Sequence, residues 1–297
     1  MTDRKHALEV PTPAPLPSPP QPPTEDRLRR VLRRILPSRA FPKGRIAVIR
    51  LHGTIGGGER TLELIELARR LRESNRVPAV VLDIDSPGGS ATASDELLIA
   101  FRRLAAAKPL VASIRGVGAS GAYLAAMAAH RLLANPHAVV GSIGVIAAAP
   151  RVPRLLERLG VTVSESKAGR LKGMGVPWRE ETEEERVKEQ AIVDQFYDAF
   201  VHAIAQGRRL TPERARELAT GEIWLGEEAL ELGLIDEIGD LERAIEVAAA
   251  MAGVPAKAAP VRIRQPLLSR LIGRFSSSLA SSVAAELEAR LTDRIRY

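Results

Sequence analysis

The stretch of sequence that most strongly indicates the fold is Gly116-Val117-Gly118-Ala119-Ser120-Gly121-Ala122-Tyr123, which is rich in glycine. An apolar run at 109–114 precedes it and predicts a short buried strand, and a run of small residues at 123–129 with high helix propensity follows it. A hydroxyl group on such a turn can act on a bound substrate, because small neighbours admit a substrate backbone and free N–H groups at a helix start stabilise an oxyanion. The alternative is that Ser120 only caps the helix, which is the ordinary role of serine at such a boundary.

Strand and helix patterns alternate on both sides of this stretch. Three further strands and two helices are predicted, at 46–51, 77–84 and 131–134 and at 61–73 and 90–107 respectively. This alternation predicts an α/β fold of repeated βαβ units around a parallel sheet. Ligands bind such sheets beyond the carboxyl ends of the strands, where the turns Ser86–Gly89 and Gly116–Gly121 both lie. Two glycine-rich turns are therefore expected to meet at one edge of the sheet.

The chain divides into a globular body and two end segments of unusual composition. The predicted parts are a disordered proline-rich tail at 1–23, a basic amphipathic helix with a linker at 24–43, one globular domain at 44–253 and a basic amphipathic tail at 254–297. Within the body, a long charged helix is predicted from about Glu180 to Gln206, and Thr211 is expected to cap the next helix.

The basic ends carry much of the net charge of +7. The helix predicted at 25–36 suits either an anionic membrane surface or docking on the protein itself or on a partner chain. No apolar run reaches the about 20 residues that a transmembrane helix needs, and the N-terminus lacks the features of a secretory signal. The sequence therefore predicts a cytoplasmic protein or one that is held peripherally at a membrane.

Composition excludes several kinds of site. The chain has no cysteine, which rules out disulfides, thiolate catalysis and cysteine-ligated metals. Aromatic residues make up only 3% of the chain, which argues against a surface that stacks nucleic-acid bases. No nucleic-acid partner is therefore expected.

Activation of Ser120 requires a base, and the chain has five histidines. None of them comes with an evident carboxylate to orient it, so a Ser–His–Asp triad has no support from the sequence; they are His6, His52, His130, His137 and His202. A lysine can take the role where burial lowers its pKa from about 10.4 toward neutrality. Lys172 is the better candidate, because its neighbourhood is apolar and glycine-rich, whereas Lys167 follows Glu165 closely. A solvated surface lysine is the alternative for either.

Five short motifs follow one another along the chain. They are Asp85-Ser86-Pro87-Gly88-Gly89, Gly118-Ala119-Ser120-Gly121-Ala122-Tyr123, Gly141-Ser142-Ile143-Gly144-Val145, Lys172 and Gly233-Leu234-Ile235-Asp236. In this order and spacing they resemble the signal peptide peptidase A family of serine peptidases, over residues 46–249. The resemblance implies the fold of the Clp-protease and crotonase superfamily, here with flanking amphipathic helices, and a Ser–Lys dyad.

The resemblance also implies a role for each matching residue. Ser120 matches the nucleophile, Lys172 the general base and Ser142 the serine whose hydroxyl helps to hold the lysine. The oxyanion hole would be formed by Gly88, Gly89 and Gly121. The implied enzyme uses no metal, other cofactor or ATP. It hydrolyses hydrophobic or unfolded peptides, such as signal-peptide remnants, through an acyl-enzyme, and it forms a homo-oligomeric ring.

This chain departs from the family pattern in two respects. Family members usually carry an N-terminal membrane span, where this chain has only a short basic helix, and the site has few aromatics, with Tyr123 and Trp178 the nearest in sequence. Two other functions remain open. One is a crotonase-like acyl-CoA thioester enzyme, which would use the glycine turns without Ser120 or Lys172. The other is a non-enzymatic scaffold on a membrane surface.

Overall fold

The computed structural model describes residue 41 and residues 43–261. The expected proline-rich tail, the basic helix that follows it and nearly all of the expected C-terminal tail lie outside these residues. The strands are Ile46–His52 (β1), Val80–Ser86 (β2), Leu110–Ala119 (β3), Arg131–Ala134 (β4), Val139–Gly141 (β5), Ile223–Leu225 (β6), Glu237–Ile238 (β7) and Ala258–Pro260 (β8). The helices are Glu59–Glu73 (α2), Ala91–Ala105 (α3), Gly121–Ala126 (α4), Pro153–Arg158 (α5), Glu183–Arg208 (α6), Pro212–Leu218 (α7), Gly226–Glu231 (α8) and Leu241–Ala252 (α9).

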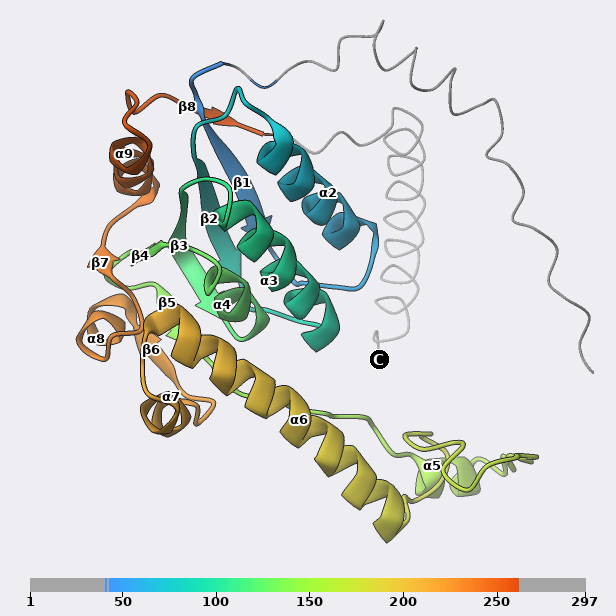
Figure 1. Ribbon diagram of the computed structural model, residues 1–297. Coiled ribbons are helices and arrows are strands. Elements are labelled where there is room, and N and C mark those ends of the chain that lie inside the picture. Colours follow the sequence, from blue (N-terminus) through green and yellow to red (C-terminus); the bar gives the residue numbers. More distant parts are fainter. Residues whose placement is uncertain (1–40, 42, 262–297) are drawn as a thin grey trace, which may run out of the picture. The chain divides into compact units, whose positions relative to one another are not determined.

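The strands of this described part form one sheet in the order β6-β5-β3-β2-β1-β8, and β4 pairs with β3 and β7 (Figure 1). Every pair is parallel except β5 with β6. Helices α2 and α3 supply the crossovers between β1, β2 and β3, as parallel neighbours require. The predicted α/β fold with a mostly parallel sheet is confirmed.

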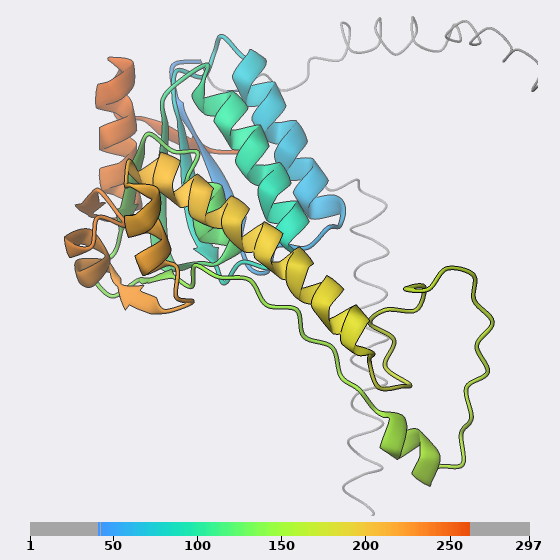
Figure 2. The same ribbon diagram turned by 60° about the horizontal axis from the view of Figure 1, so that its bottom comes forward.

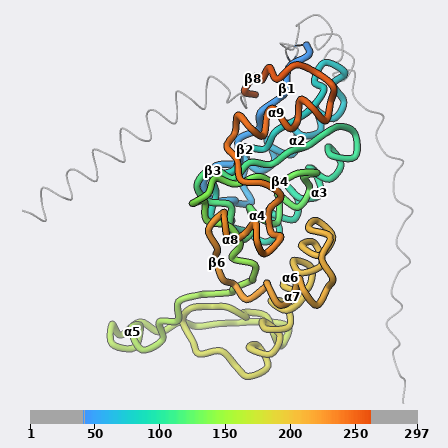
Figure 3. Tube along the Cα trace, turned by 90° about the vertical axis from the view of Figure 1, so that its left-hand side faces the viewer, coloured from blue at the N-terminus to red at the C-terminus, as the bar shows by residue number. Residues whose placement is uncertain are grey.

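The sheet separates two hydrophobic cores because successive side chains of a strand point to opposite faces. In β2, Val80, Leu82 and Ile84 belong to the larger core, to which α2, α3, α4 and the C-terminal end of α6 also contribute. Val81 belongs to the smaller core, which α9 covers. Figure 1 shows α9 and the paired α2 and α3 on different sides of the strands, and Figure 3 is viewed from the side of α9. Because both faces are covered, the strands read as almost unbroken apolar runs.

Two elements differ from the sequence prediction at their ends. Strand β3 continues through the glycine-rich stretch to Ala119, so α4 begins at Gly121 and not at Tyr123. Strand β8 lies beyond the predicted end of the domain at residue 253 and pairs with β1. The short run 258–260 has no alternating pattern of its own, and only its register with β1 makes it a strand.

The motif Gly233–Asp236 fastens α4 to the body of the protein. The hydroxyl of Tyr123, which is fully buried, donates a hydrogen bond of 2.5 Å to the carbonyl oxygen of Leu234. Burial raises the pKa of Tyr123, so this hydroxyl stays a donor. Asp236 accepts hydrogen bonds from Arg208, at 2.8 Å, and from the N–H of Leu132, at 2.7 Å. The motif therefore holds the helix that follows Ser120 and the end of α6 together.

Helix α6 carries a long segment away from the sheet. We call residues 147–181 the arm; this segment contains α5 and the expected base, and Figures 1 and 2 show it at the end of α6 that is distant from the sheet. At the other end of α6, a Cβ on Gly207 would lie only 2.9 Å from the side chain of Met127, so this end packs against α4. Between Glu185 and Gly207 the helix is about 33 Å long.

Candidate active site

Ser120 lies at the start of α4 with a free side chain. It occupies the N-cap position, yet its side chain makes no capping hydrogen bond, in contrast to Thr182 at the start of α6. Its backbone has φ +50° and ψ −125°, a conformation that non-glycine residues rarely adopt. The hydroxyl is therefore presented on a strained turn between β3 and α4, and the ordinary capping role of a serine does not explain it.

The glycines of the second turn lie directly against Ser120. A Cβ on Gly88 would lie 2.9 Å from the Cβ of Ser120 and 2.6 Å from the nitrogen of Gly121. The N–H of Gly88 donates to the hydroxyl of Ser86, at 3.1 Å. Among the described residues, the N–H groups of Gly89 and Gly121 have no acceptor. A Cβ on Gly121 would lie 3.5 Å from the nitrogen of Gly89, so these two free donors are neighbours.

This arrangement has the parts of an oxyanion hole. Two N–H donors close together beside a nucleophile can stabilise the negative charge that develops on a carbonyl oxygen during acyl transfer. Gly88 has φ +90° and no room for a side chain, and the two free N–H groups belong to Gly89 and Gly121. The structure thus brings Ser120 and the three predicted glycines together.

Substitution of Gly121 by alanine is expected to lower kcat/KM by about 10²-fold, because the new Cβ would lie 2.0 Å from the hydroxyl oxygen of Ser94 and would displace the turn. Peptide hydrolysis by Gly121→Ala is compared with that by Gly57→Ala, where nothing lies within 4 Å of the new Cβ. Adding Ser94→Gly removes the obstructing side chain and should restore most of the activity. Wild-type kcat/KM in the single Gly121→Ala variant would contradict this assignment.

Ser142 lies next to the Ser120 turn on the adjacent strand. The N–H of Ser120 donates to the carbonyl oxygen of Gly141, at 2.8 Å, and the N–H of Ser142 donates to that of Glu222, at 2.6 Å. Ser142 also has a positive φ, of +50°. Among the described residues, the backbone of the following segment Gly144–Pro150 makes no hydrogen bond. An unpaired extended segment therefore leads away from the nucleophile.

Lys172 does not lie beside Ser120 in the single chain. It belongs to the arm, in a turn whose next residue, Gly173, is hydrogen-bonded through its carbonyl to Arg179, at 3.0 Å. Arg179 in turn binds Glu185 at the distal end of α6, whereas Ser120 precedes the helix that packs against the proximal end. The length of α6 therefore separates the two residues. Lys172 is also exposed, although its apolar sequence neighbourhood favoured burial.

Lys172 nevertheless differs from the charged residues around it. Four neighbouring cations are paired with carboxylates: Lys167 with Glu165, Arg170 with Glu184, Arg179 with Glu185 and Arg151 with Glu181. Lys172 makes no ion pair with any residue that the structure describes. Its amine is therefore not held by a carboxylate of the described residues. The same comparison makes Lys167, whose amine lies 3.4 Å from Glu165, the weaker candidate.

One histidine lies close to a carboxylate in a way that the sequence alone does not indicate. The Nε2 atom of His52 lies 3.2 Å from Asp83, a fully buried carboxylate that Arg115 also contacts at 2.7 Å. The two residues stand on neighbouring strands, and only the register of β1 with β2 brings them together. Strand β2 separates β1 from β3, so His52 lies about 10 Å across the sheet from the strand of Ser120. The Nε2 atom of His52 makes no hydrogen bond to any described residue, so its approach to Asp83 is a close contact outside hydrogen-bond geometry.

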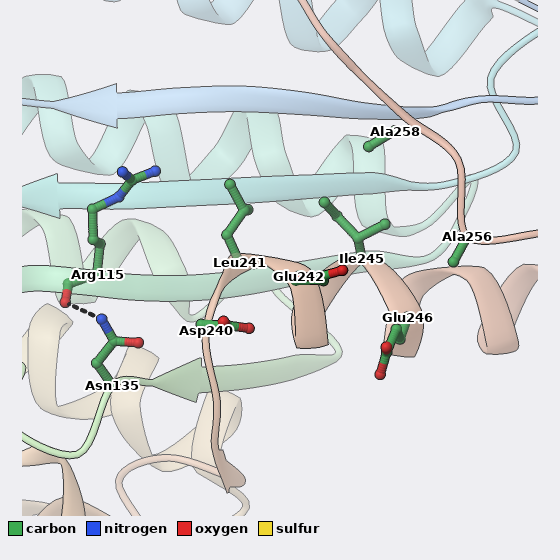
Figure 4. A pocket seen from close by; sticks show the side chains of 9 residues that line it. All are labelled: Arg115, Asn135, Asp240, Leu241, Glu242, Ile245, Glu246, Ala256 and Ala258. Atoms are coloured by element: carbon green, nitrogen blue, oxygen red, sulfur yellow. Dashed lines mark hydrogen bonds between the residues drawn. The ribbon is translucent and has the colours of Figure 1, made fainter.

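One hollow, with a volume of about 620 Å³, lies between α9 and the sheet, where Figure 4 shows Arg115 and Asn135 opposite the start of α9. Its lining mixes Arg115 with acidic residues of α9 and includes none of the predicted site residues. Within the described part of the chain, there is also no cluster of acidic and histidine side chains that could hold a metal ion. None of its helices combines the length and apolarity needed to cross a bilayer.

Comparisons with known proteins identify the family of this chain. The model of the family "Peptidase family S49" matches residues 102–255, a little more than half of the chain. The protein named "Putative protease slr0021" of Synechocystis sp. is 37% identical over 242 residues, which cover 80% of this chain and 87% of that protein. "Serine protease SPPA, chloroplastic" of Arabidopsis thaliana is 34% identical, and the match covers 81% of this chain but 37% of that longer protein.

A solved structure of a mutant form of the "1510-N membrane-bound stomatin-specific protease" is similar with a TM-score of 0.49 and 16% identity, over 75% of this chain and 93% of that one. The family match and the long match to the Synechocystis protein decide the assignment. This chain belongs to peptidase family S49, the signal peptide peptidase A family of serine proteases.

Proposed function

We propose that this protein hydrolyses peptide bonds with Ser120 as nucleophile and Lys172 as general base. The observation that carries the proposal is the state of Ser120, whose hydroxyl makes no capping bond and whose Cβ lies against Gly88, beside two free N–H donors. In the reaction, the hydroxyl oxygen of Ser120 attacks the scissile carbonyl carbon while the neutral amine of Lys172 takes the hydroxyl proton. The N–H groups of Gly89 and Gly121 stabilise the oxyanion.

The second half of the reaction reverses these roles. The ammonium group of Lys172 gives its proton to the leaving amine, and the bond between that nitrogen and the carbonyl carbon breaks. Water then attacks the acyl-enzyme while Lys172 takes a proton from it. Lys172 returns this proton to the Ser120 oxygen as the bond between that oxygen and the carbonyl carbon breaks, which releases the acid product and restores the hydroxyl. Ser142 lies one residue beyond the carbonyl that binds the Ser120 N–H, so its hydroxyl is available to hold the lysine amine.

In this proposal each active site combines two copies of the chain. Ser120 and Lys172 lie at opposite ends of α6 in one chain, so a second copy is needed to bring an arm to the nucleophile. The exposed apolar side chains in and beside the arm support such an assembly, because contact with a second copy would remove them from water. Ile146 is 90% exposed, Leu159 66% and Leu155 54%. A head-to-tail contact of this kind closes into a ring of identical copies.

The substrate class follows from the surroundings of Ser120. We propose that an extended, hydrophobic or unfolded peptide pairs its backbone with Gly144–Pro150, whose own backbone groups have no partner in the described part of the chain. Remnants of cleaved signal peptides have this character. The proposed chemistry uses no metal or other cofactor.

The proposal is tested by covalent labelling of the full-length protein. A fluorophosphonate probe is expected to add to Ser120 alone, as read by mass spectrometry of tryptic peptides, and Ser120→Ala should carry no adduct. Labelling should become faster as the pH rises, because deprotonation of the base activates the hydroxyl. A folded, oligomeric protein without any adduct would contradict the proposal and would favour an acyl-CoA thioester enzyme, which acyl-CoA binding would reveal, or a non-enzymatic scaffold.

A further inference from the structure

An ion pair with a buried carboxylate joins the arm to the start of α6: Arg179 belongs to the arm and Glu185 to the helix. Glu185 is 2% exposed although it lies at the distal start of α6, and both of its carboxylate oxygens accept hydrogen bonds from Arg179, at 2.5 and 2.8 Å. Hydrogen bonds from Arg179 and from the N–H of Thr182 lower the pKa of Glu185 to about 2. Burial of a charge is costly unless it is fully paired, so this pair needs an explanation beyond surface solvation.

The pair reaches the turn of Lys172 through one hydrogen bond. A single nitrogen of Arg179 donates both to Glu185 and to the carbonyl oxygen of Gly173, the residue that follows Lys172, at 3.0 Å. Gly173 has a φ of +96°, and a Cβ there would lie 3.0 Å from a carboxylate oxygen of Glu165. The turn is therefore in contact with Arg179 and with Glu165 at Gly173.

We infer that Arg179 and Glu185 are positioning residues, which fix the Lys172 turn to the end of α6 so that the amine reaches the nucleophile of the adjacent copy. This inference rests on the proposed function, because it assigns a role to the pair only if Lys172 is the base. Neither residue touches the substrate. Arg179 fixes the backbone beside Lys172, and Glu185 fixes Arg179 while it also completes the capping box with Thr182.

The charges around the turn balance one another. The loop before the turn contributes Glu165 and Lys167, and the turn itself contributes Arg170. The start of α6 contributes Glu184 and Glu185, and Arg151 and Glu181 form a further pair. Removing one member of the Arg179–Glu185 pair leaves an uncompensated charge beside the base. The remaining charge is negative if Arg179 is removed and positive if Glu185 is removed. The two substitutions should therefore shift the pH dependence of activity in opposite directions.

The experiment measures kcat/KM against pH for hydrolysis of a hydrophobic fluorogenic peptide by the full-length oligomer. Arg179→Met leaves the Glu185 carboxylate unbalanced, which favours the protonated base, so the acid limb should move to higher pH by about half a pH unit. Glu185→Gln leaves the Arg179 guanidinium unbalanced, so the acid limb should move to lower pH by a similar amount. Both variants should lower kcat by about 10-fold with little change in KM, because the lysine is less well placed.

A neighbouring ion pair supplies the matched controls. Arg186 and Glu183 lie in the same turn of α6, are exposed, and bind each other at 2.6 Å; no hydrogen bond links either of them to Gly173. Arg186→Met and Glu183→Gln should therefore keep the wild-type kcat and acid limb. A role of Arg179 and Glu185 in folding alone cannot move the acid limb in opposite directions, so shifts of the same sign, or profiles like those of the controls, would overturn the inference.

A conservative variant covers the case in which Arg179→Met fails to assemble. Arg179→Lys keeps the positive charge, but a lysine has only one nitrogen and cannot donate hydrogen bonds from two nitrogens to Glu185 while it also binds Gly173. It should keep the acid limb near its wild-type position and still lose kcat, and a wild-type kcat would overturn the inference. If Lys172→Ala is inactive while these variants behave like the controls, only the positioning role fails. If Lys172→Ala is active, the proposed dyad itself fails.

Discussion

Replacement of Lys172 by alanine is expected to lower kcat/KM for peptide hydrolysis by about 10³-fold, since general-base catalysis contributes a factor of this size. Lys167→Ala should keep most of the activity, because the Lys167 amine lies 3.4 Å from the carboxylate of Glu165 and is held as an ion pair. The two variants remove the same side chain five positions apart in the arm. The ratio of their kcat/KM values therefore reports the position of the base and not a general effect of losing positive charge.

Loss of stability should not explain the result. Lys172 is exposed and makes no ion pair with a described residue, so its truncation should change the free energy of unfolding by less than about 0.5 kcal/mol. Thermal unfolding and oligomer mass of Lys172→Ala should match those of the wild type. Equal losses of activity in Lys172→Ala and Lys167→Ala would show that the base is misplaced.

A third variant examines the competing histidine. His52→Gln should keep the activity, because His52 is turned to Asp83 and lies two strands from the strand of Ser120. The competing result, a loss in His52→Gln with full activity in Lys172→Ala, would replace the Ser–Lys dyad by a Ser–His–Asp arrangement. Only the pairing with Asp83 makes this control necessary, and the sequence did not indicate that pairing.

The parts of the site that sequence could predict are local. Each glycine-rich turn follows an apolar strand, and parallel strands bring their carboxyl ends to one edge, so the meeting of Gly88 and Gly89 with Ser120 follows from the order of elements. The same reasoning could not show that the hydroxyl of Ser120 is free of a capping bond, since a catalytic and a capping serine share one pattern. Backbone angles and hydrogen bonds decided that point.

The parts that sequence missed depend on distance in space. The apolar neighbours of Lys172 predict that it is buried, but burial depends on which surface covers a segment, and Lys172 is exposed among the described residues of one chain. The sequence predicts the long helix at about Glu180–Gln206, against the observed Glu183–Arg208, but its pattern does not show that this helix separates Ser120 from Lys172. The pattern Thr182-x-x-Glu185 was also readable as a capping box.

The second large effect is recovery of activity when two inactive variants are combined. Ser120→Ala retains the arm with its lysine, and Lys172→Ala retains the nucleophile. If each site joins Ser120 of one copy to Lys172 of its neighbour, a mixed ring contains sites with both residues intact. Random assembly of equal amounts gives about a quarter of the sites in this state, because each of the two residues is present with a probability of one half.

The mixed oligomer is made by co-expressing the two variants with different affinity tags and purifying through both tags in turn. Each variant alone, purified in the same way, supplies the baseline, and a ring that carries both substitutions in every copy supplies the control for contamination. Fluorophosphonate labelling of the mixed ring should appear only on copies that carry Lys172→Ala, since these alone retain Ser120. That distribution identifies which copy supplies the nucleophile.

Peptide hydrolysis by this doubly purified mixed oligomer is the most direct test of the account. We predict about a quarter of the wild-type kcat per copy, with the two parent variants at the level of the doubly substituted control. A mixed oligomer that is fully assembled yet no more active than its parents would contradict the shared site, and would require the arm to return Lys172 to Ser120 of its own chain.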